Sequence, residues 1–378
     1  MNNKFLKRQI TSHIYNAIVE FQDYFHQFEV EHLRSDEQQK KTTKYISADW
    51  STANGNLGEK LLTPIAKAKA KIFLDGLIEI GCNTVSLQIQ SPLFFDDFPK
   101  NNEYKEFYQW AISYAKEKGL LVFVETSPAF SETQYSDIIY DYSLLTPEQY
   151  LEKRYNQIIA IVNMKPDIIS FIHEPDTERA ITKLEISDDK FFNLLQIVVS
   201  YKQETDSKVQ IAGGLPITSD FEAMIPFLDY VDILNIHLYP IVYPKRLSTV
   251  NSLIKLDKIL QQVQKPVFLG ETWVFKATLF DYLTSENFVD LSTKLYNRNT
   301  WNFETVDASF ISILAAIGDC RQNLIGFNLF WSAFLFADID GENMSYKDGM
   351  TAINKLAIEN IMTGQHSDSG DMVKMLFP

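Results

Sequence analysis

Short apolar runs and longer amphipathic segments alternate along most of this chain. Runs of strand character occur at residues 44–49, 84–90, 120–125, 167–173, 209–212, 231–237, 266–271 and 324–330. Segments with helical periodicity lie between or after them, at residues 59–81, 103–118, 147–164, 188–205, 249–264, 285–320 and 346–363. Because parallel neighbouring strands need a long crossover connection, this alternation favours a parallel sheet built from βαβ units.

The number of these units indicates the architecture. Several runs are continuously apolar, which is typical of strands buried on both faces. Eight runs favour a closed (β/α)8 TIM barrel over residues 44–365 rather than an open doubly wound sheet, which usually has fewer strands. Apolar positions three or four apart predict an N-terminal helix at residues 10–28, and a polar linker follows it, so that residues 1–43 form an extension. Residues 366–378 are assigned to a C-terminal tail.

Composition and charge narrow the classes of partner. Of the 378 residues, 46% are apolar and 22% are charged, as in an ordinary globular protein. A net charge of −14 opposes binding to nucleic acid or to an anionic membrane surface, so neither is expected as a partner. Only Cys82 and Cys320 are present, which excludes a disulfide framework. No leader or membrane span is visible, which predicts a soluble cytoplasmic chain, or a secreted one if a leader was trimmed; the oligomeric state stays open.

Candidate chemistry lies at the ends of the predicted strands, where barrel enzymes carry their working residues. Polar and aromatic side chains follow the fourth, sixth, seventh and eighth runs: His173 and Glu174, His237 and Tyr239, Glu271 and Trp273, and Trp331. Two carboxylates on opposed strands suit glycoside hydrolysis, because one protonates the leaving oxygen while the other attacks the anomeric carbon. Burial beside a dry barrel core tends to raise the pKa of such a group, as a general acid needs.

These motifs resemble clan A, the retaining β-glycosidases with a (β/α)8 barrel, over residues 44–360. The motif FIHEPDT places Glu174 at the acid/base position after strand four, and VFLGETW places Glu271 at the nucleophile position after strand seven, 271 − 174 = 97 residues later. NIHLYP resembles the strand-six motif whose tyrosine, here Tyr239, hydrogen-bonds the nucleophile. FNLFWSA implies that Trp331 forms the floor of the −1 sugar subsite. The resemblance implies a retaining hydrolase of β-linked oligo- or polysaccharides that needs no cofactor or metal.

The chain departs from the clan at two positions. His173 precedes the acid/base, where most of the clan has an asparagine that hydrogen-bonds the sugar 2-hydroxyl and some β-mannanases have histidine. The clan also has an arginine near the end of strand two, whereas this run ends Gln88-Ile89-Gln90-Ser91. Two interpretations stay open: Gln88 or Gln90 replaces the arginine, or the site is weakened. The sugar and its linkage are not indicated.

Several side chains at the strand ends are predicted to bind substrate: His173, His237, Trp331, Trp273, Trp50, Asp49, Glu125 and Gln90. Glu125 suits either a sugar hydroxyl or a metal, and Trp50 suits either a sugar subsite or the core.

Two rival functions remain. In a metal-dependent sugar isomerase or epimerase, a divalent cation would be held by four side chains, Glu125, Glu174, His237 and Glu271. Tyr239 and Trp331 would have no task there. A non-catalytic carbohydrate-binding barrel is the second rival, which the missing arginine permits.

Overall fold

The computed structural model describes residues 19, 22–24, 26–28, 44–131, 133–242, 247–276, 284, 304–339 and 344–377. Most of the helix predicted at residues 10–28 lies outside these residues, as do residues 285–303 of the helix predicted at 285–320.

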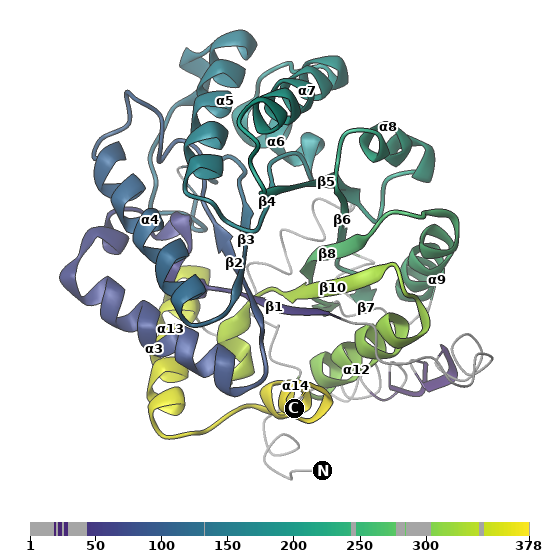
Figure 1. Cartoon of the computed structure of the whole chain (residues 1–378). Helices are drawn as coiled ribbons and strands as arrows, with labels where there is room; N and C mark the ends of the chain where they lie inside the picture. Colours follow the sequence, from purple (N-terminus) through teal and green to yellow (C-terminus); the bar gives the residue numbers. More distant parts are fainter. Residues whose placement is uncertain are drawn as a thin grey trace.

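Eight parallel strands close into a barrel at the centre of the molecule (Figure 1). They are β1 (Tyr45–Asp49), β2 (Thr84–Gln88), β3 (Leu121–Glu125), β4 (Ile168–Ser170), β5 (Gln210–Pro216), β6 (Ile233–Leu238), β8 (Val267–Thr272) and β10 (Leu324–Leu329). Each strand pairs with its neighbours in chain order, and β1 closes the circle against β10. Every predicted run contributes one strand, so the predicted (β/α)8 barrel is confirmed.

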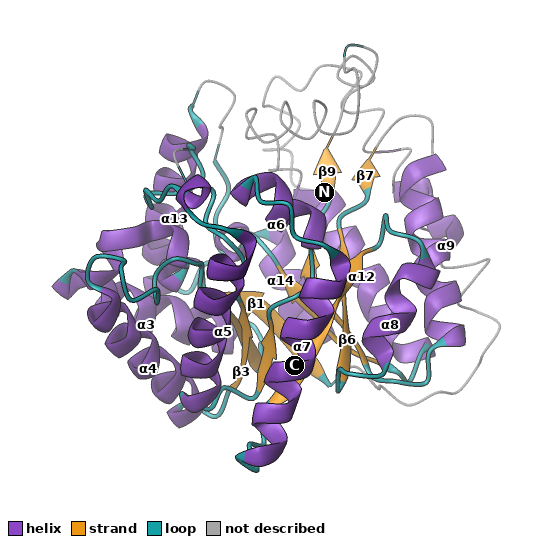
Figure 2. Ribbon diagram, turned by 90° about the horizontal axis from the view of Figure 1, so that it is seen from above, coloured by secondary structure: helices purple, strands orange, loops and turns teal. Residues whose placement is uncertain are grey.

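Helices surround this barrel (Figures 1 and 2). They are α3 (Pro64–Glu79), α4 (Asn101–Glu117), α5 (Pro147–Asn163), α6 (Pro175–Thr182), α7 (Asp188–Glu204), α8 (Ile225–Leu228), α9 (Leu247–Gln262), α12 (Glu304–Cys320), α13 (Tyr346–Met362) and α14 (Asp368–Leu376). Short 3₁₀ helices occupy Ser51–Ala53, Gly55–Leu62, Tyr142–Leu144, Phe221–Met224 and Ser332–Leu335. Local signals fix some helix starts: Thr146 and Gln149 form a capping box at the beginning of α5.

A small parallel pair, β7 (Ile241–Val242) and β9 (Phe275–Lys276), continues the chain beyond β6 and β8. It projects past one end of the barrel (Figure 2). Because these strands follow the carboxyl ends of β6 and β8, this is the end at which barrel enzymes build their sites.

The interior of the barrel has an apolar layer below a polar one. Six side chains from six strands form the apolar layer: Phe123, Ile168, Ala212, Ile233, Phe268 and Ile325. Side chains on a strand return to the same face every second residue. Two positions further along three of these strands are Glu125, Ser170 and Asn235, so polar side chains form the next layer toward the carboxyl ends.

The segment assigned to a C-terminal tail carries a helix, α14, which packs against α12. Beyond it, Phe377 lies edge-on to Phe327 of β10, with ring centroids 5.8 Å apart. Among the described helices, none has both the length and the apolar character that crossing a bilayer requires.

Candidate active site

Glu174 and Glu271 lie at the carboxyl ends of β4 and β8, as the sequence predicts. Each side chain is 17% exposed, so both are accessible from outside while most of their surface is buried. Pro175 is the first residue of α6, which therefore begins immediately after Glu174 and fixes its backbone. This helix was not predicted. Glu271 pairs with His237 of β6, just past an irregularity in the register between Asn235 and His237.

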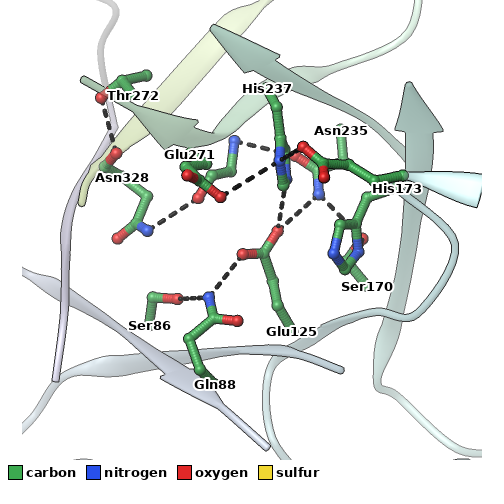
Figure 3. A network of polar contacts seen from close by, with 12 residues as sticks. Ser86, Gln88, Glu125, Ser170, His173, Asn235, His237, Glu271, Thr272 and Asn328 are labelled. Atoms are coloured by element: carbon green, nitrogen blue, oxygen red, sulfur yellow. Dashed lines mark hydrogen bonds and ion pairs between the residues drawn. The ribbon is translucent and has the colours of Figure 1, made fainter. Parts of the chain in front are cut away.

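His237 connects the two carboxylates. Its Nδ1 lies 3.0 Å from Glu174 Oε1 and 3.5 Å from Glu271 Oε2. Oxygen atoms of the two carboxylates lie within 4.8 Å of each other (Figure 3 shows Glu271 and His237). The two acidic residues predicted from the sequence, 97 residues apart in the chain, thus both contact the imidazole of His237.

Two aromatic donors complete the contacts of the pair. The hydroxyl of Tyr239 donates to Glu174 Oε1 at 2.6 Å, and the indole Nε1 of Trp273 donates to Glu271 Oε1 at 2.7 Å. The resemblance implied that Tyr239 supports the nucleophile position, Glu271; its described hydrogen bond supports the other carboxylate. Trp331 continues this aromatic row, edge-on to Trp273 with ring centroids 6.2 Å apart.

The surroundings separate the pKa values of the two carboxylates. Burial alone would raise the pKa of Glu174, but donation from His237, the charge of that imidazole and the Tyr239 hydroxyl lower it to about 2. Burial raises the pKa of Glu271 to about 8; the charge of His237 opposes this effect and the charge of Glu174 adds to it. At neutral pH the pair therefore holds one proton between them, which is the state that combined acid and nucleophile chemistry needs.

Glu125 lies in the polar layer of the barrel, where its carboxylate faces Gln88, Asn235 and His237 (Figure 3). It is 1% exposed. Its Oε1 accepts from Asn235 Nδ2 at 2.8 Å and lies 3.1 Å from His237 Nε2, and its Oε2 accepts from Gln88 Nε2 at 2.7 Å. The predicted role in binding substrate is replaced by one inside the protein, because no face of this carboxylate is open. Gln88 likewise reaches Glu125, which accounts for one of the two glutamines at the position of the missing arginine.

The polar layer leaves no room for a side chain on Gly270. A β-carbon there would lie 2.3 Å from Asn235 Oδ1 and 2.6 Å from Glu125 Oε1. The same Asn235 oxygen accepts from the Gly270 backbone N–H at 2.9 Å. The glycine in VFLGET thus lets β8 approach the buried acid, and its N–H fixes which way the Asn235 amide points.

His173 is buried and stacks on His237, with ring centroids 4.8 Å apart. Its Nδ1 lies 3.5 Å from Ser170 Oγ. Burial lowers its pKa to about 4, against the attraction of Glu125. His173 is therefore neutral beside His237, and its predicted contact with substrate stays a prediction.

Three other predicted substrate contacts lie deeper than expected. Trp50 is 1% exposed, and its indole donates to the Ala70 carbonyl of α3, so it is a core residue, which is the second of the two roles predicted for it. Asp49 is buried and accepts from the Ser332 backbone N–H at 2.7 Å, which fixes the turn that carries Trp331. Gln90 is 4% exposed, with its Oε1 against Gly55.

Two groups of side chains have the composition of cation sites. They are Glu125, His173 and His237, and Glu174, His237 and Glu271. In the first, both oxygens of Glu125 accept from side-chain amides, whose hydrogens occupy the positions that a cation would need. In the second group, Glu174 Oε1 is already hydrogen-bonded to the Tyr239 hydroxyl and lies 3.0 Å from His237 Nδ1, so these two groups occupy the positions around that oxygen that a cation would need. The described donor sets therefore fit a hydrogen-bonded network better than a bound cation.

A second buried network, absent from the sequence prediction, lies outside the barrel wall behind β2, β3 and β4. Arg154 of α5 is fully buried and donates five hydrogen bonds, which is every N–H that a guanidinium has. The acceptors are Glu178 Oε1, Ser91 Oγ, Thr126 Oγ1 and the carbonyls of Thr126 and Phe171. Because Thr126 follows Glu125 and Glu178 lies in α6, this network locks the strand ends that present the acidic residues.

The fold has relatives among solved structures, although no protein-family model and no curated protein matches this chain. An exo-β-1,4-mannosidase from Opitutaceae bacterium strain TAV5 is 15% identical over 90% of this chain and 61% of its own, with a TM-score of 0.53. A GH113 β-1,4-mannanase is 13% identical over 84% of this chain and 99% of its own, with a TM-score of 0.49. The Ignisphaera aggregans GH53 catalytic domain is 18% identical over 84% and 96%, with a TM-score of 0.47.

At these identities the similarity shows the fold. The first of these structures supports the (β/α)8 barrel fold, and it supplies no residue roles for this chain.

Proposed function

We propose that this chain is a retaining β-glycoside hydrolase. The observation that carries the proposal is the pair Glu174 and Glu271, whose carboxylate oxygens lie within 4.8 Å of each other at the open end of the barrel. Retaining enzymes hold their two carboxyl groups about 5–5.5 Å apart, whereas inverting enzymes separate them by about 6.5–9.5 Å to admit a water. The short separation supports direct attack by one carboxylate on the sugar.

The proposed reaction has two steps. Glu174 protonates the glycosidic oxygen while Glu271 attacks the anomeric carbon, so the bond to the leaving group breaks as a glycosyl ester forms on Glu271. Glu174, now ionised, then removes a proton from water, and the resulting attack at the anomeric carbon releases Glu271. The product keeps the β configuration, and the enzyme regains its single shared proton. The aromatic row of Tyr239, Trp273 and Trp331 offers ring faces to the sugar.

The hydrogen bonds and the burial of the two carboxylates distribute charge in the opposite sense to these roles. Two donors, His237 and Tyr239, favour the ionised form of Glu174, and burial keeps the proton on Glu271. The assignment by strand position therefore requires that the proton move to Glu174 once a sugar is bound. A separation within 4.8 Å is short enough for one bridging water or hydroxyl. The reversed assignment, with Glu174 as nucleophile, is the second candidate because the same two donors support it.

Product stereochemistry tests the proposal. Aryl β-glycosides and β-glucan, mannan and galactan polymers are offered to the wild type and to Glu271→Ala in parallel, and the first anomer released is recorded by NMR. We expect the β anomer first from the wild type and a rate lower by several orders of magnitude from the variant. Release of the α anomer first, or equal turnover by both proteins, would contradict it.

Leaving-group dependence separates the two role assignments. If Glu174 is the acid, Glu174→Ala slows substrates with poor leaving groups much more than activated aryl glycosides, because the latter need no proton. If the roles are reversed, Glu271→Ala shows that dependence instead. Equal slowing of both substrate types by both variants would count against an acid role for either residue.

Chelation tests the isomerase rival. Glycoside hydrolysis by the proposed mechanism is unchanged after dialysis against EDTA, since every step uses side chains of this chain. Loss of sugar conversion under EDTA, with recovery on adding a divalent cation, would favour the metal-dependent reaction.

A further inference from the structure

The polar layer of the barrel contains an acid that the proposed reaction does not use. Glu125 is 1% exposed and lies at the end of β3, below Glu174 and Glu271. A buried carboxylate is costly unless hydrogen bonds and a charge compensate it. Both its oxygens are hydrogen-bonded, and one of them lies 3.1 Å from His237 Nε2.

The hydrogen bonds around His237 fix its protonation. Nε2 faces Glu125 Oε1 at 3.1 Å, and Nδ1 faces Glu174 Oε1 at 3.0 Å. A neutral imidazole has one N–H and one lone pair, so one nitrogen would direct its lone pair at a carboxylate oxygen. Only the imidazolium donates at both positions. Geometry alone therefore favours a positive charge on His237.

The hydrogen bonds around Glu125 fix its charge as well. Asn235 can present only its N–H₂ group to Glu125, because its oxygen accepts from the Gly270 backbone N–H. Gln88 donates to the other oxygen. With donors on both oxygens, a proton on Glu125 would displace one of these hydrogen bonds, so this acid is held ionised.

We propose that Glu125 is a positioning residue that keeps His237 doubly protonated, and that the His237 imidazolium in turn keeps one of the two carboxylates at the mouth, Glu174 or Glu271, ionised and in place. The inference rests on the proposed function, to which it adds the source of positive charge in the site. His237 contacts both Glu174 and Glu271, so one cation serves the pair in either distribution of the shared proton.

The groups facing His237 come from several elements. They are Glu125 of β3, His173 and Glu174 after β4, Glu271 of β8 and Tyr239 after β6. Burial would lower the pKa of His237, but the charge and hydrogen bond of Glu125, followed by those of Glu174, raise it well above its ordinary value. The pKa of Glu125 is lowered in spite of burial, chiefly by the charge of His237. His173, with a pKa lowered to about 4, leaves the proton to His237.

The test compares the full-length wild type with Glu125→Gln, which keeps the shape of the side chain and removes its charge. Asp176→Asn is the matched control: it makes the same carboxylate-to-amide change in α6, where the Asp176 side chain is 94% exposed. Glu125→Asp retains the charge and is the conservative variant. Thermal unfolding of each protein establishes that it is folded before the other measurements.

Nitrogen-15 NMR of the histidine rings measures the protonation of His237 without any substrate, with His237→Asn to assign its signals. We expect the wild-type and Asp176→Asn proteins to show the imidazolium from pH 5 to pH 8. In Glu125→Gln the titration midpoint should fall by about one to three pH units, the usual effect of one opposite charge. A neutral His237 at pH 7 in the wild type would overturn the proposal even if Glu125→Gln does not fold.

The pH dependence of hydrolysis provides the second readout. In Glu125→Gln the ionised carboxylate loses its cationic partner, so the acidic limb of kcat/KM should move up by about one pH unit or more. We expect kcat to fall about 10- to 100-fold with a smaller change in KM, by analogy with the hydrogen-bond partners of metal-bound histidines, whose loss costs about that much. Glu125→Asp should recover most of the wild-type profile. A Glu125→Gln profile that matches the control would overturn the proposal.

The two proposals fail separately. If no β-glycoside is hydrolysed but NMR shows that the His237 imidazolium depends on Glu125, the charge pair stands and the proposed function falls. If hydrolysis with retention is found and the His237 titration ignores Glu125, the function stands and the charge pair falls.

Discussion

Two buried ionic networks stand on opposite sides of the same barrel wall, and they differ in how completely their charges are compensated. Outside the wall, Arg154 pairs with Glu178 at 3.1 Å, and the guanidinium uses all its donors. Inside it, three carboxylates, Glu125, Glu174 and Glu271, surround the single imidazole of His237. The outer network has one charge of each sign and no access to solvent. The inner one has excess negative charge and opens at the mouth.

The comparison distinguishes structural from chemical use of buried charge. A fully compensated pair gains nothing from moving a proton, so the outer network can only hold strand ends in place. In the inner network one proton cannot satisfy both Glu174 and Glu271, and their pKa values separate to about 2 and about 8. A group that is short of a proton beside one that holds it is the arrangement that acid and nucleophile chemistry requires.

The largest effect is expected from Glu271→Gln. Removing the charge that attacks the sugar should lower kcat by about 10³-fold or more, since the loss of a covalent nucleophile is rarely compensated. At neutral pH the Tm should change little, because Glu271 has a pKa of about 8 and is already protonated there. Steady-state kinetics and calorimetry on the same preparation check both. A large fall in Tm with retained kcat would mean that Glu271 stabilises the fold and does not serve the reaction, which contradicts the role given to the inner network.

Arg154→Met is expected to show the opposite pattern. Glu178 would be left buried without its partner, and removing one member of a buried pair costs about 3–5 kcal/mol in the free energy of unfolding. Chemical denaturation measures it, with Lys208→Met as the control, because that lysine forms an exposed pair with Asp206 and should not matter. The kcat of the folded fraction should stay within about tenfold of the wild type. Normal stability would show that the outer network is not structural.

A smaller effect is expected in the pH dependence of the free energy of unfolding, which should fall as the pH rises because of Glu271. The pKa of Glu271 rises from 4.5 to about 8, chiefly by burial, so the folded protein binds this proton more tightly than the unfolded chain. The stabilisation is complete below pH 4.5 and is lost as the pH rises toward about 8. Glu271→Gln should flatten the fall in free energy of unfolding across that window. Burial raises the pKa of Asp49 to about 6, so Asp49 contributes to the same fall only in the lower part of this pH window. Because Asp49 is unchanged in Glu271→Gln, its contribution to the slope remains and serves as an internal reference. An unchanged slope would contradict the raised pKa.

The smallest effect is expected from Trp273→Phe. The substitution keeps the ring and removes the indole N–H that donates to Glu271 at 2.7 Å, a hydrogen bond worth about 1.5–3 kcal/mol to an ionised acceptor and less to a protonated one. Because this donor lowers the pKa of Glu271, its loss should move the basic limb of kcat/KM to higher pH by less than about one unit. A shift to lower pH would mean that Glu271 is not the group that titrates there.

The sequence predicts the barrel and its acidic pair because both depend on local patterns. Continuous apolar runs followed by Glu174 and Glu271 identify strands and their exposed ends without any knowledge of contacts. The same pattern holds a further signal: Asn235 interrupts the apolar run of β6 two residues before His237, which places both on the inward face. Tyr150, Arg154 and Gln157 likewise share the buried face of α5.

What the sequence could not predict depends on contacts between distant segments. Trp50 follows a strand just as Trp331 does, and only the packing of α3 decides that its indole donates to Ala70. Whether Tyr239 hydrogen-bonds one carboxylate or the other depends on side-chain geometry across the mouth, which residue spacing does not fix. The helix α6, which begins at Pro175, was not predicted because it is short and its first turn is polar, so it has no apolar periodicity to identify it.

Covalent labelling tests the central claim most directly. A 2-deoxy-2-fluoro β-glycoside with an activated leaving group slows the second step of a retaining enzyme, so the glycosyl ester accumulates and adds its mass to the intact protein. Proteolysis and mass spectrometry then locate it. The account predicts one label per chain, on Glu271, and none in Glu271→Ala. A label on Glu174 would reverse the roles of the pair, and no label during measurable hydrolysis would contradict the covalent mechanism.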